Sequence, residues 1–421
     1  MKLEKFVFTI LTTLSLIGSL SMAAPVCRDV FYYNPAVAQL VVADPVQQWL
    51  NWEQAYNVEA FRKSQTPVFV PGSRVDASTV NVTFLPSAPP VLHSLIERPD
   101  GVEWFRHPYN TNSTLPHYND PQQTTLTTYF TASRSLALIL GKNVFTLKMP
   151  TDHPHGPEGK LQKGKATTKE DITDGINRMS YIAQVDQKIG QDPQLILAKE
   201  VATVADKKTG EGYLIRDISF MNDGHYYLPA LSIPYVGRKI AELNHQSPDA
   251  FWQIHYAELL GRSKAKLLLR YGLQMETPNS QNMLIQLDHD LRPTGVLIFR
   301  DISDTVLIEG IARGLGADQV LRRDAAMGVE NSRVLRPYWR NSAWKFDLAG
   351  DNSPSPETLR NWGLAHDNAY KKEIEKALDV DLSQFTIIDQ NPDFDKFMNS
   401  YLVQTKVKAY REKLESENKA L

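Results

Sequence analysis

Two polar pairs, Gln281-Asn282 and Arg300-Asp301, flank a segment whose pattern predicts a β-hairpin. The first strand reads MLIQL (283–287), the turn reads DHDLRPTG, and the return strand reads VLIF (296–299). Both pairs therefore fall at the same end of the hairpin. The amide oxygen of Asn282 and the carboxylate of Asp301 are hard ligands of the kind that Mg²⁺ shares with substrate phosphates, as in protein kinases. The alternative is a hairpin with solvated ends and a surface ion pair.

A second group of residues, nearer the N-terminus, has the side chains that bind phosphate. Ser133, Arg134 and Ser135 are adjacent, and Lys148 lies in an alternating segment that predicts a strand over 144–149. A loop rich in glycine and lysine follows and contains Lys165. Arginine forms forked hydrogen bonds with phosphate, lysine acts as a point charge, and hydroxyl groups donate. A phosphate site is therefore expected without a GxxxxGK[ST] or GxGxxG motif; the alternative for the loop is solvated surface.

The elements that must position these residues mix helices and strands, which predicts an α+β fold. We expect a short helix over 134–140, a helix after Lys165 capped by Thr173 or Asp174, and a strand hairpin over 196–217. Apolar residues at helical spacing over 251–272 predict a helix that leads into the first hairpin. Further helices are expected at 309–313, 356–378 and 394–417.

Residues 1–23 have the pattern of a cleaved secretory signal peptide. Lys2 and Lys5 precede an apolar run, and Ser21 and Ala23 are small residues suited to a cleavage site. An uncleaved membrane anchor is the alternative, but hydroxyl and glycine residues make the run a weak membrane span. Since Cys27 is the only cysteine, the mature chain is expected to form no internal disulfide. We expect an exported protein, periplasmic or secreted, with no stable membrane span once the signal is removed.

Length and charge set the remaining limits. A chain of 421 residues is long enough for two or three lobes. The formal net charge of −2 provides no basic surface for nucleic acid, so any anion site must be local. We divide the mature chain into a Pro-rich N-terminal segment (24–125), a phosphate-binding lobe (126–245), and a lobe with the site hairpin and C-terminal helices (246–421).

The order of these motifs resembles the NRPS-independent siderophore synthetases, the aerobactin-synthetase-like family. An S-x-R-[ST]-like segment, a strand lysine, a basic loop, Gln-Asn and Arg-Asp follow one another over about residues 131–305. The resemblance implies a cupped hand with thumb, fingers and a kinase-like palm, where 126–245 is fingers-like and 246–421 palm-like. It also implies that ATP and Mg²⁺ are used to adenylate a carboxylate, which an amine or hydroxyl then attacks.

The resemblance assigns roles to individual residues. The nucleotide would be bound by Ser133, Arg134, Ser135, Lys148 and Lys165, and Mg²⁺ by Asn282 and Asp301. The implied catalytic residues are Arg134, Lys148, Glu276 and Gln281.

Several positions depart from the family pattern. Asn279 stands where the family carries a histidine, and Glu276 reaches the family's glutamate position only with a one-residue shift, because Thr277 occupies it. Ser133 is also one residue closer to Arg134 than S-x-R-T requires. The absence of the family's histidine argues against adenylation but is compatible with nucleotide and metal binding. An export signal would also separate the chain from cytosolic ATP.

Two classes of function are consistent with these residues. One is an ATP-dependent carboxylate ligase; the other is an exported, noncatalytic protein that binds an anionic ligand such as a carboxylate siderophore. A kinase-like phosphotransferase is a third possibility, but no HRD or HGD base precedes Asn282. The sequence identifies neither the acyl substrate, nor the nucleophile, nor the oligomeric state.

Overall fold

The computed structural model describes residues 40, 44–53, 66–108, 110, 116–132, 134–150, 169–276, 278–317, 331–344, 346–348 and 350–420. The predicted signal peptide, Ser133, Thr277 and Lys165 lie outside these residues. None of the helices in the described part of the chain has both the length and the apolar character that a membrane span requires.

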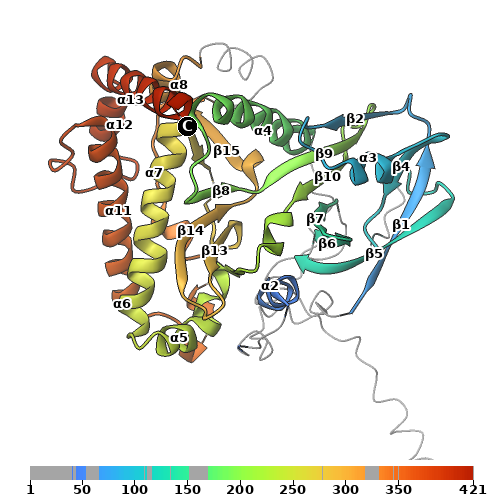
Figure 1. Ribbon diagram of the computed structural model, residues 1–421, viewed down its shortest axis with the longest axis horizontal. Coiled ribbons are helices and arrows are strands. Elements are labelled where there is room, and N and C mark those ends of the chain that lie inside the picture. Colours follow the sequence, from blue (N-terminus) through green and yellow to red (C-terminus); the bar gives the residue numbers. More distant parts are fainter. Residues whose placement is uncertain are drawn as a thin grey trace, which may run out of the picture.

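One lobe is built on a nine-stranded, largely antiparallel sheet (Figure 1). Its strands, in spatial order, are β2 (Val80–Phe84), β9 (Lys199–Asp206), β10 (Gly212–Asp217), β7 (Asn143–Lys148), β6 (Ser135–Leu140), β5 (Gln122–Ala132), β1 (Val68–Val75), β4 (Gly101–Phe105) and β3 (Glu97–Arg98). Helix α3 (Pro90–Ile96) precedes β3, and α4 (Lys169–Ile189) packs against β9. The sheet combines strands from both sides of residue 125, and the boundary expected there falls inside β5.

The other lobe contains two smaller sheets and most of the helices. The first sheet has the order β11 (Tyr226–Pro229), β13 (Met283–Leu287), β14 (Pro293–Phe299) and β8 (Leu195–Leu197), and the second has β12 (Leu273–Met275), β15 (Thr305–Ile308) and β16 (Asn331–Ser332). The helices are α5 (Ile233–Leu243), α6 (Pro248–Trp252), α7 (Leu259–Tyr271), α8 (Glu309–Gly314), α10 (Trp339–Ser342), α11 (Pro356–Leu378), α12 (Pro392–Met398) and α13 (Tyr401–Ala420). Figure 1 shows α7 and α11 side by side along the outer edge of this lobe.

Helix α2 (Pro45–Glu53) contacts both lobes, because it packs against β11 of the four-stranded sheet and β5 of the nine-stranded sheet. A hydrophobic core extends from β1 through β7 and β9 to α7, and a second core lies under α8, α11, α12 and α13. The mixed α+β class predicted from the sequence is confirmed.

Most predicted elements agree with the structure, and three differ. The segment 134–140 is strand β6 instead of a helix, because it pairs with β5 on one side and β7 on the other, and this pairing outweighs local helix propensity. Helix α4 begins at Lys169, so Thr173 and Asp174 lie inside it and do not cap it. The segment 394–417 is divided between α12 and α13, since Asn399 ends the first helix.

Candidate functional site

Lys148 and Asp301 meet where the two lobes join. Lys148 is the last residue of β7, and Asp301 follows β14 in a left-handed backbone conformation (φ 61°). The Lys148 ammonium nitrogen lies 3.2 Å from Asp301 Oδ1, and Lys148 is buried. The contact spans 153 positions of sequence and brings together two residues that the sequence had placed in separate groups.

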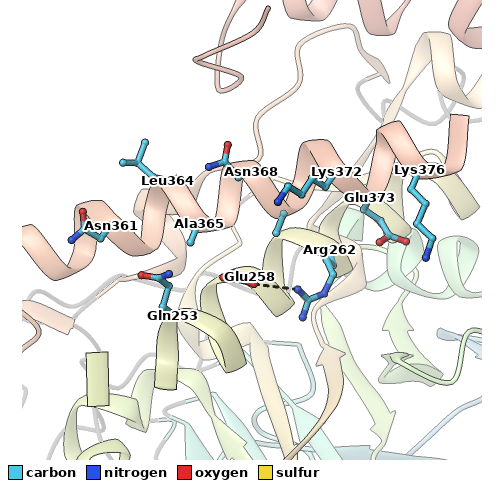
Figure 2. Close-up of a pocket in the computed structure, with 11 residues that line it drawn as sticks. Gln253, Glu258, Arg262, Asn361, Leu364, Ala365, Asn368, Lys372, Glu373 and Lys376 are labelled. Carbon is cyan, nitrogen blue, oxygen red and sulfur yellow. Dashed lines mark ion pairs between the residues drawn. The ribbon is translucent and has the colours of Figure 1, made fainter. Parts of the chain in front are cut away.

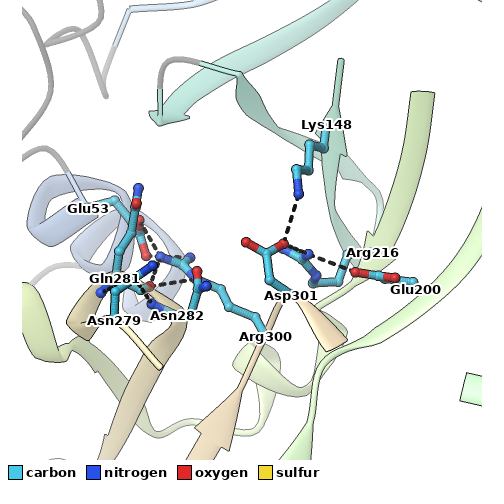
Figure 3. Close-up of polar contacts among 9 residues, drawn as sticks. All are labelled: Glu53, Lys148, Glu200, Arg216, Asn279, Gln281, Asn282, Arg300 and Asp301. Atoms are coloured by element: carbon cyan, nitrogen blue, oxygen red, sulfur yellow. Dashed lines mark hydrogen bonds and ion pairs between the residues drawn. The ribbon is translucent and has the colours of Figure 1, made fainter. Parts of the chain in front are cut away.

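Arg216 and Glu200 extend this contact into a buried charge network (Figure 3). Arg216, near the end of β10, donates to Glu200 Oε1 at 3.0 Å and also to Asp301 Oδ1. Glu200 is fully buried, and its Oε2 has no hydrogen-bond partner among the described residues. This oxygen lies against Gly175 of α4, where an added Cβ would come within 1.6 Å of it. A residue larger than glycine at position 175 would therefore clash with the Glu200 carboxylate.

The two carboxylates in the network have opposite pKa shifts. Burial raises the pKa of Glu200 above its usual value, and Arg216 offsets this only in part. Burial would also raise the pKa of Asp301, but Lys148, Arg216 and Arg300 together hold it well below its usual value. Asp301 therefore stays ionised at neutral pH, and its carboxylate is suited to bind a cation.

Arg300 forms a separate buried pair with Glu53 of α2. Its two terminal nitrogens lie 2.7 and 3.0 Å from the two oxygens of the Glu53 carboxylate, in forked geometry. Arg300 Nε donates to the Gln281 carbonyl at 2.8 Å, and Trp49 Nε1 donates to Glu53 at 2.8 Å. Because Arg300 is only 7% exposed, the alternative of an ordinary surface ion pair with solvated ends does not describe this end of the hairpin.

Hydrogen bonds from neighbouring residues fix the turn that carries Gln281 and Asn282. The side-chain oxygen of Asn279 accepts hydrogen bonds from the backbone N–H groups of Gln281 (3.1 Å) and Asn282 (3.2 Å). Ser280 Oγ donates to the Trp344 carbonyl at 2.8 Å. The Arg300 N–H donates to the Asn282 carbonyl at 3.0 Å, so both polar pairs lie at the same end of the hairpin, as predicted.

Of the other candidate residues, the structure describes Arg134, Ser135 and Glu276 but not Ser133 or Lys165. Ser135 pairs directly with Lys148 across β6 and β7, and the Arg134 carbonyl accepts from Met149 N–H at 2.9 Å, so both lie beside the end of β7. Glu276 is exposed after β12, on a different sheet, and its N–H donates to the Asp304 carbonyl. Ser133 and Lys165, both expected to bind phosphate, lie outside the described residues.

Three charged residues of the site were not predicted: Glu200 and Arg216 of the network, and Glu53, the partner of Arg300. Arg216 had a signal, because I-R-D-I-S at 215–219 repeats R-D-I-S at 300–303. Glu200 had a weaker one, as a charge within the apolar strand KEVATV. Glu53 had none, since its partner Arg300 lies 247 positions away.

Two pockets of the described structure lie apart from the candidate residues. One is a surface groove of about 520 Å³ between α11 and the helical segment that carries Glu258 and Arg262. Figure 2 draws the residues that line it, including the ion pair of Glu258 with Arg262, whose charged atoms lie 3.6 Å apart. A cavity of similar volume lies between α4 and β8 and is lined partly by Met179, Leu195 and Lys199. Neither of these two hollows is lined by Lys148, Asn282 or Asp301.

Comparison with known proteins gives a match in structure. Neither a protein-family model nor a curated protein sequence matches the chain. Among solved structures, aerobactin synthetase IucC from a hypervirulent pathotype of Klebsiella pneumoniae superposes with a TM-score of 0.57 at 12% identity, covering 87% of this chain and 78% of that one. The chain has the fold of an aerobactin synthetase.

ATP-bound aerobactin synthetase IucA from the same pathotype gives a second match, with a TM-score of 0.53 at 13% identity. The match covers 74% of this chain, which spans 63% of the length of IucA. At these identities the comparison establishes the aerobactin-synthetase fold. The chemistry performed on that fold must be inferred from the residues of this chain.

Proposed function

We propose that the protein is an ATP- and Mg²⁺-dependent ligase, which activates a small-molecule carboxylate for condensation with an amine or hydroxyl, as in siderophore biosynthesis. The observation that carries this proposal is the partly buried contact of Lys148 with Asp301 at the junction of the two lobes. It pairs a strand lysine with a carboxylate at the end of the site hairpin, on a fold of which one solved member is ATP-bound.

In this proposal the cations bind phosphate and the oxygen ligands bind metal. Lys148, Arg134 and the loop residue Lys165 neutralise the triphosphate, and the hydroxyls of Ser133 and Ser135 donate to it. Asn282 and Asp301 would hold Mg²⁺, which supplies positive charge at the phosphates. Two features fit this role: the pKa of Asp301 is held low, and both contacts of Lys148 and Arg216 are made to its Oδ1, not to Oδ2.

The reaction transfers an adenylyl group and then an acyl group. A carboxylate oxygen attacks the α-phosphorus of ATP, the bond to the β-phosphate oxygen breaks, and pyrophosphate leaves. The amine or hydroxyl then attacks the acyl carbon, AMP leaves, and the nucleophile loses a proton. Fixed cations act on the charge that develops on pyrophosphate, which is where preorganised charge is most effective. Gln281 and Glu276 are proposed to orient the reacting groups.

Product analysis tests the proposal. The protein is incubated with Mg²⁺, ATP, a polycarboxylate such as citrate, and an amine such as hydroxylamine, and released phosphates are identified. Pyrophosphate release that depends on the carboxylate and is lost in Lys148→Met supports the ligase. ADP release would indicate a phosphotransferase instead. Lys142→Met is the matched control, because Lys142 is exposed in the β6–β7 turn.

A second candidate function, an exported noncatalytic protein that binds an anionic ligand, is favoured by Asn279. At the position of the family's histidine, Asn279 uses its side chain to cap the Gln281-Asn282 turn. This is a structural role that requires no reaction. Tight binding of a carboxylate siderophore without ATP turnover would support this function. Intact-mass analysis of the exported protein would test the accompanying proposal of export, with an N-terminus near Ala24 expected.

A further inference from the structure

The cavity between α4 and β8 lies apart from the candidate site and is large enough for a small ligand. Its volume of about 520 Å³ falls within the range of about 300 to 1,000 Å³ that small-molecule sites occupy. Gln191 and Pro193, which line it, are exposed, so solvent reaches the cavity. Its lining comes from both lobes, because β8 belongs to the four-stranded sheet and Asp217 ends β10 of the nine-stranded sheet. A ligand held there would contact both lobes.

Most of the inner lining of the cavity is apolar. Met179 and Ile182 lie three positions apart along α4, so they share one face of this helix. Leu195 and Leu197 lie two positions apart in β8, and Phe220 contributes an aromatic ring. The two α4 side chains and the two leucines are each buried. This part of the cavity therefore suits a hydrocarbon chain or ring.

The charged side chains that line the cavity have an excess of negative charge. They are Asp186, Asp192, Lys199 and Asp217. Asp192 is compensated from outside the cavity, because the ammonium of Lys266 lies 3.1 Å from its carboxylate. Lys199 stands opposite Asp217 across β9 and β10, but within the described part of the chain its ammonium forms no ion pair or hydrogen bond. Two carboxylates thus remain against one ammonium.

The charge of Asp186 is incompletely compensated within the protein. The Tyr271 hydroxyl donates to its Oδ1 at 2.7 Å. Burial nevertheless raises the pKa of the Asp186 carboxyl above its usual value, although Tyr271, Arg270 and Lys199 all act in the opposite direction. Arg270 donates to the Gly190 carbonyl and does not line the cavity. An ammonium group placed beside Asp186 would therefore stabilise its ionised form.

We propose that the cavity between α4 and β8 is a binding site for a small organic amine, with the ammonium beside Asp186 and the hydrocarbon part against the apolar residues of α4 and β8. This site is separate from the proposed nucleotide site, and the inference does not depend on the proposed ligase activity. Because a bound amine contacts α4 and both lobes, it stabilises the folded state by mass action.

Three probes that differ only in their polar end test the site. The full chain is titrated by calorimetry at about pH 8, where an alkyl ammonium is charged, with 4-phenylbutylamine, 4-phenylbutanol and 5-phenylpentanoate. The amine should bind about tenfold more tightly than the alcohol or the acid, because only the amine forms a charge-assisted contact with a carboxylate. It should also raise the melting temperature and slow amide hydrogen exchange in α4 and β8. Equal or tighter binding of the alcohol or the acid would overturn the proposal.

Two variants of the lining should change amine binding in opposite directions. Asp186→Asn removes a negative charge but keeps an oxygen that can accept from Tyr271, and it should weaken amine binding about tenfold. Lys199→Met removes a like charge and should tighten amine binding by a smaller factor. Neither variant should change the affinity for the alcohol. The opposite signs distinguish a charge effect from general loosening of the fold.

Glu258→Gln is the matched control, because Glu258 lines the groove beside α11, which has a similar volume. It should bind the amine as the wild type does. Three results would each reject the amine site: no binding of 4-phenylbutylamine by the wild type, unchanged binding in Asp186→Asn, or loss of binding in Glu258→Gln.

Discussion

Arg216 donates a hydrogen bond to Asp301, although the two residues lie 85 positions apart, Arg216 near the end of β10 and Asp301 shortly after β14 of a different sheet. Each belongs to a copy of the short sequence R-D-I-S. The contact joins the nine-stranded sheet to the site hairpin through a single carboxylate, which also contacts Lys148. Asp301 is thus both a structural link between the lobes and the proposed metal ligand, and these two roles lead to separate predictions.

Loss of the proposed phosphate-binding cations should weaken nucleotide binding without unfolding the protein. Lys148→Met and Arg134→Ala each remove a charge-assisted contact worth about 1.5 to 3 kcal/mol, which corresponds to roughly tenfold or more in affinity. Calorimetric titration with ATP measures the loss, and thermal unfolding checks the fold. Lys142→Met, on the same hairpin as Lys148 but exposed, should bind as the wild type does. Unchanged affinity in both variants would show that this segment is ordinary structure.

Asn282 and Asp301, if they share one Mg²⁺, should not act additively. Asn282→Ala and Asp301→Ala should each abolish the Mg²⁺ dependence of nucleotide binding, and the double variant should be little worse than either single variant. Titrations of ATP with and without Mg²⁺ on the four proteins read this out. Independent, additive losses would indicate that the two residues serve different purposes. Retained Mg²⁺ dependence in Asp301→Ala would remove Asp301 from the metal site.

The sequence predicted local elements well because their signals are local. Periodicity and polar turns located β13 at 283–287 and α11 at 356–378, and alternation located β7. It also placed Gln281-Asn282 and Arg300-Asp301 at one end of a hairpin. The segment 134–140 was misassigned because pairing with two neighbouring strands is a tertiary effect that Leu and Ala do not reveal.

The remainder of the site depends on contacts distant in sequence. Lys148 and Asp301 were each proposed separately, but only the fold shows that they touch. Glu53 reaches Arg300 through the packing of α2 against both lobes, and nothing in a short apolar helix indicates which sheet it will contact. Burial of Glu200 is likewise a property of how α4 lies over β9.

The buried Arg216–Glu200 pair should be required for stability. In Arg216→Met, Glu200 remains fully buried without its ion-pair partner, and loss of one partner of such a pair typically destabilises a protein by about 3 to 5 kcal/mol. Chemical denaturation measures the free energy of unfolding. The double variant Arg216→Met/Glu200→Gln should recover part of the loss, because it removes the uncompensated charge. A loss below about 1 kcal/mol in the single variant would mean that Glu200 is reached by solvent or is protonated.

Lys264 should make stability increase with pH above neutrality. This lysine of α7 is buried and donates to Ser342 Oγ at 2.8 Å, and burial lowers its pKa from 10.5 to about 7. Asp367 and Asp389 oppose the shift, and the pKa of neighbouring His366 is lowered to about 4 by burial and by Lys264. Since the shift is downward, the unfolded chain holds a proton that the folded chain lacks between about pH 7 and 10.

The free energy of unfolding should therefore rise with pH in this window, by at most about 1.4 kcal/mol per pH unit from this group. Below pH 7 both states are protonated and the contribution is constant. Denaturation at pH 7 and pH 9 measures the slope, which Lys264→Met should reduce. Lys266→Met, on the same helix but with its ammonium paired to Asp192 at 3.1 Å, should keep the wild-type slope. An equal slope in Lys264→Met and the wild type would show that Lys264 stays protonated in the folded protein, held by its acceptors and by Asp367 and Asp389.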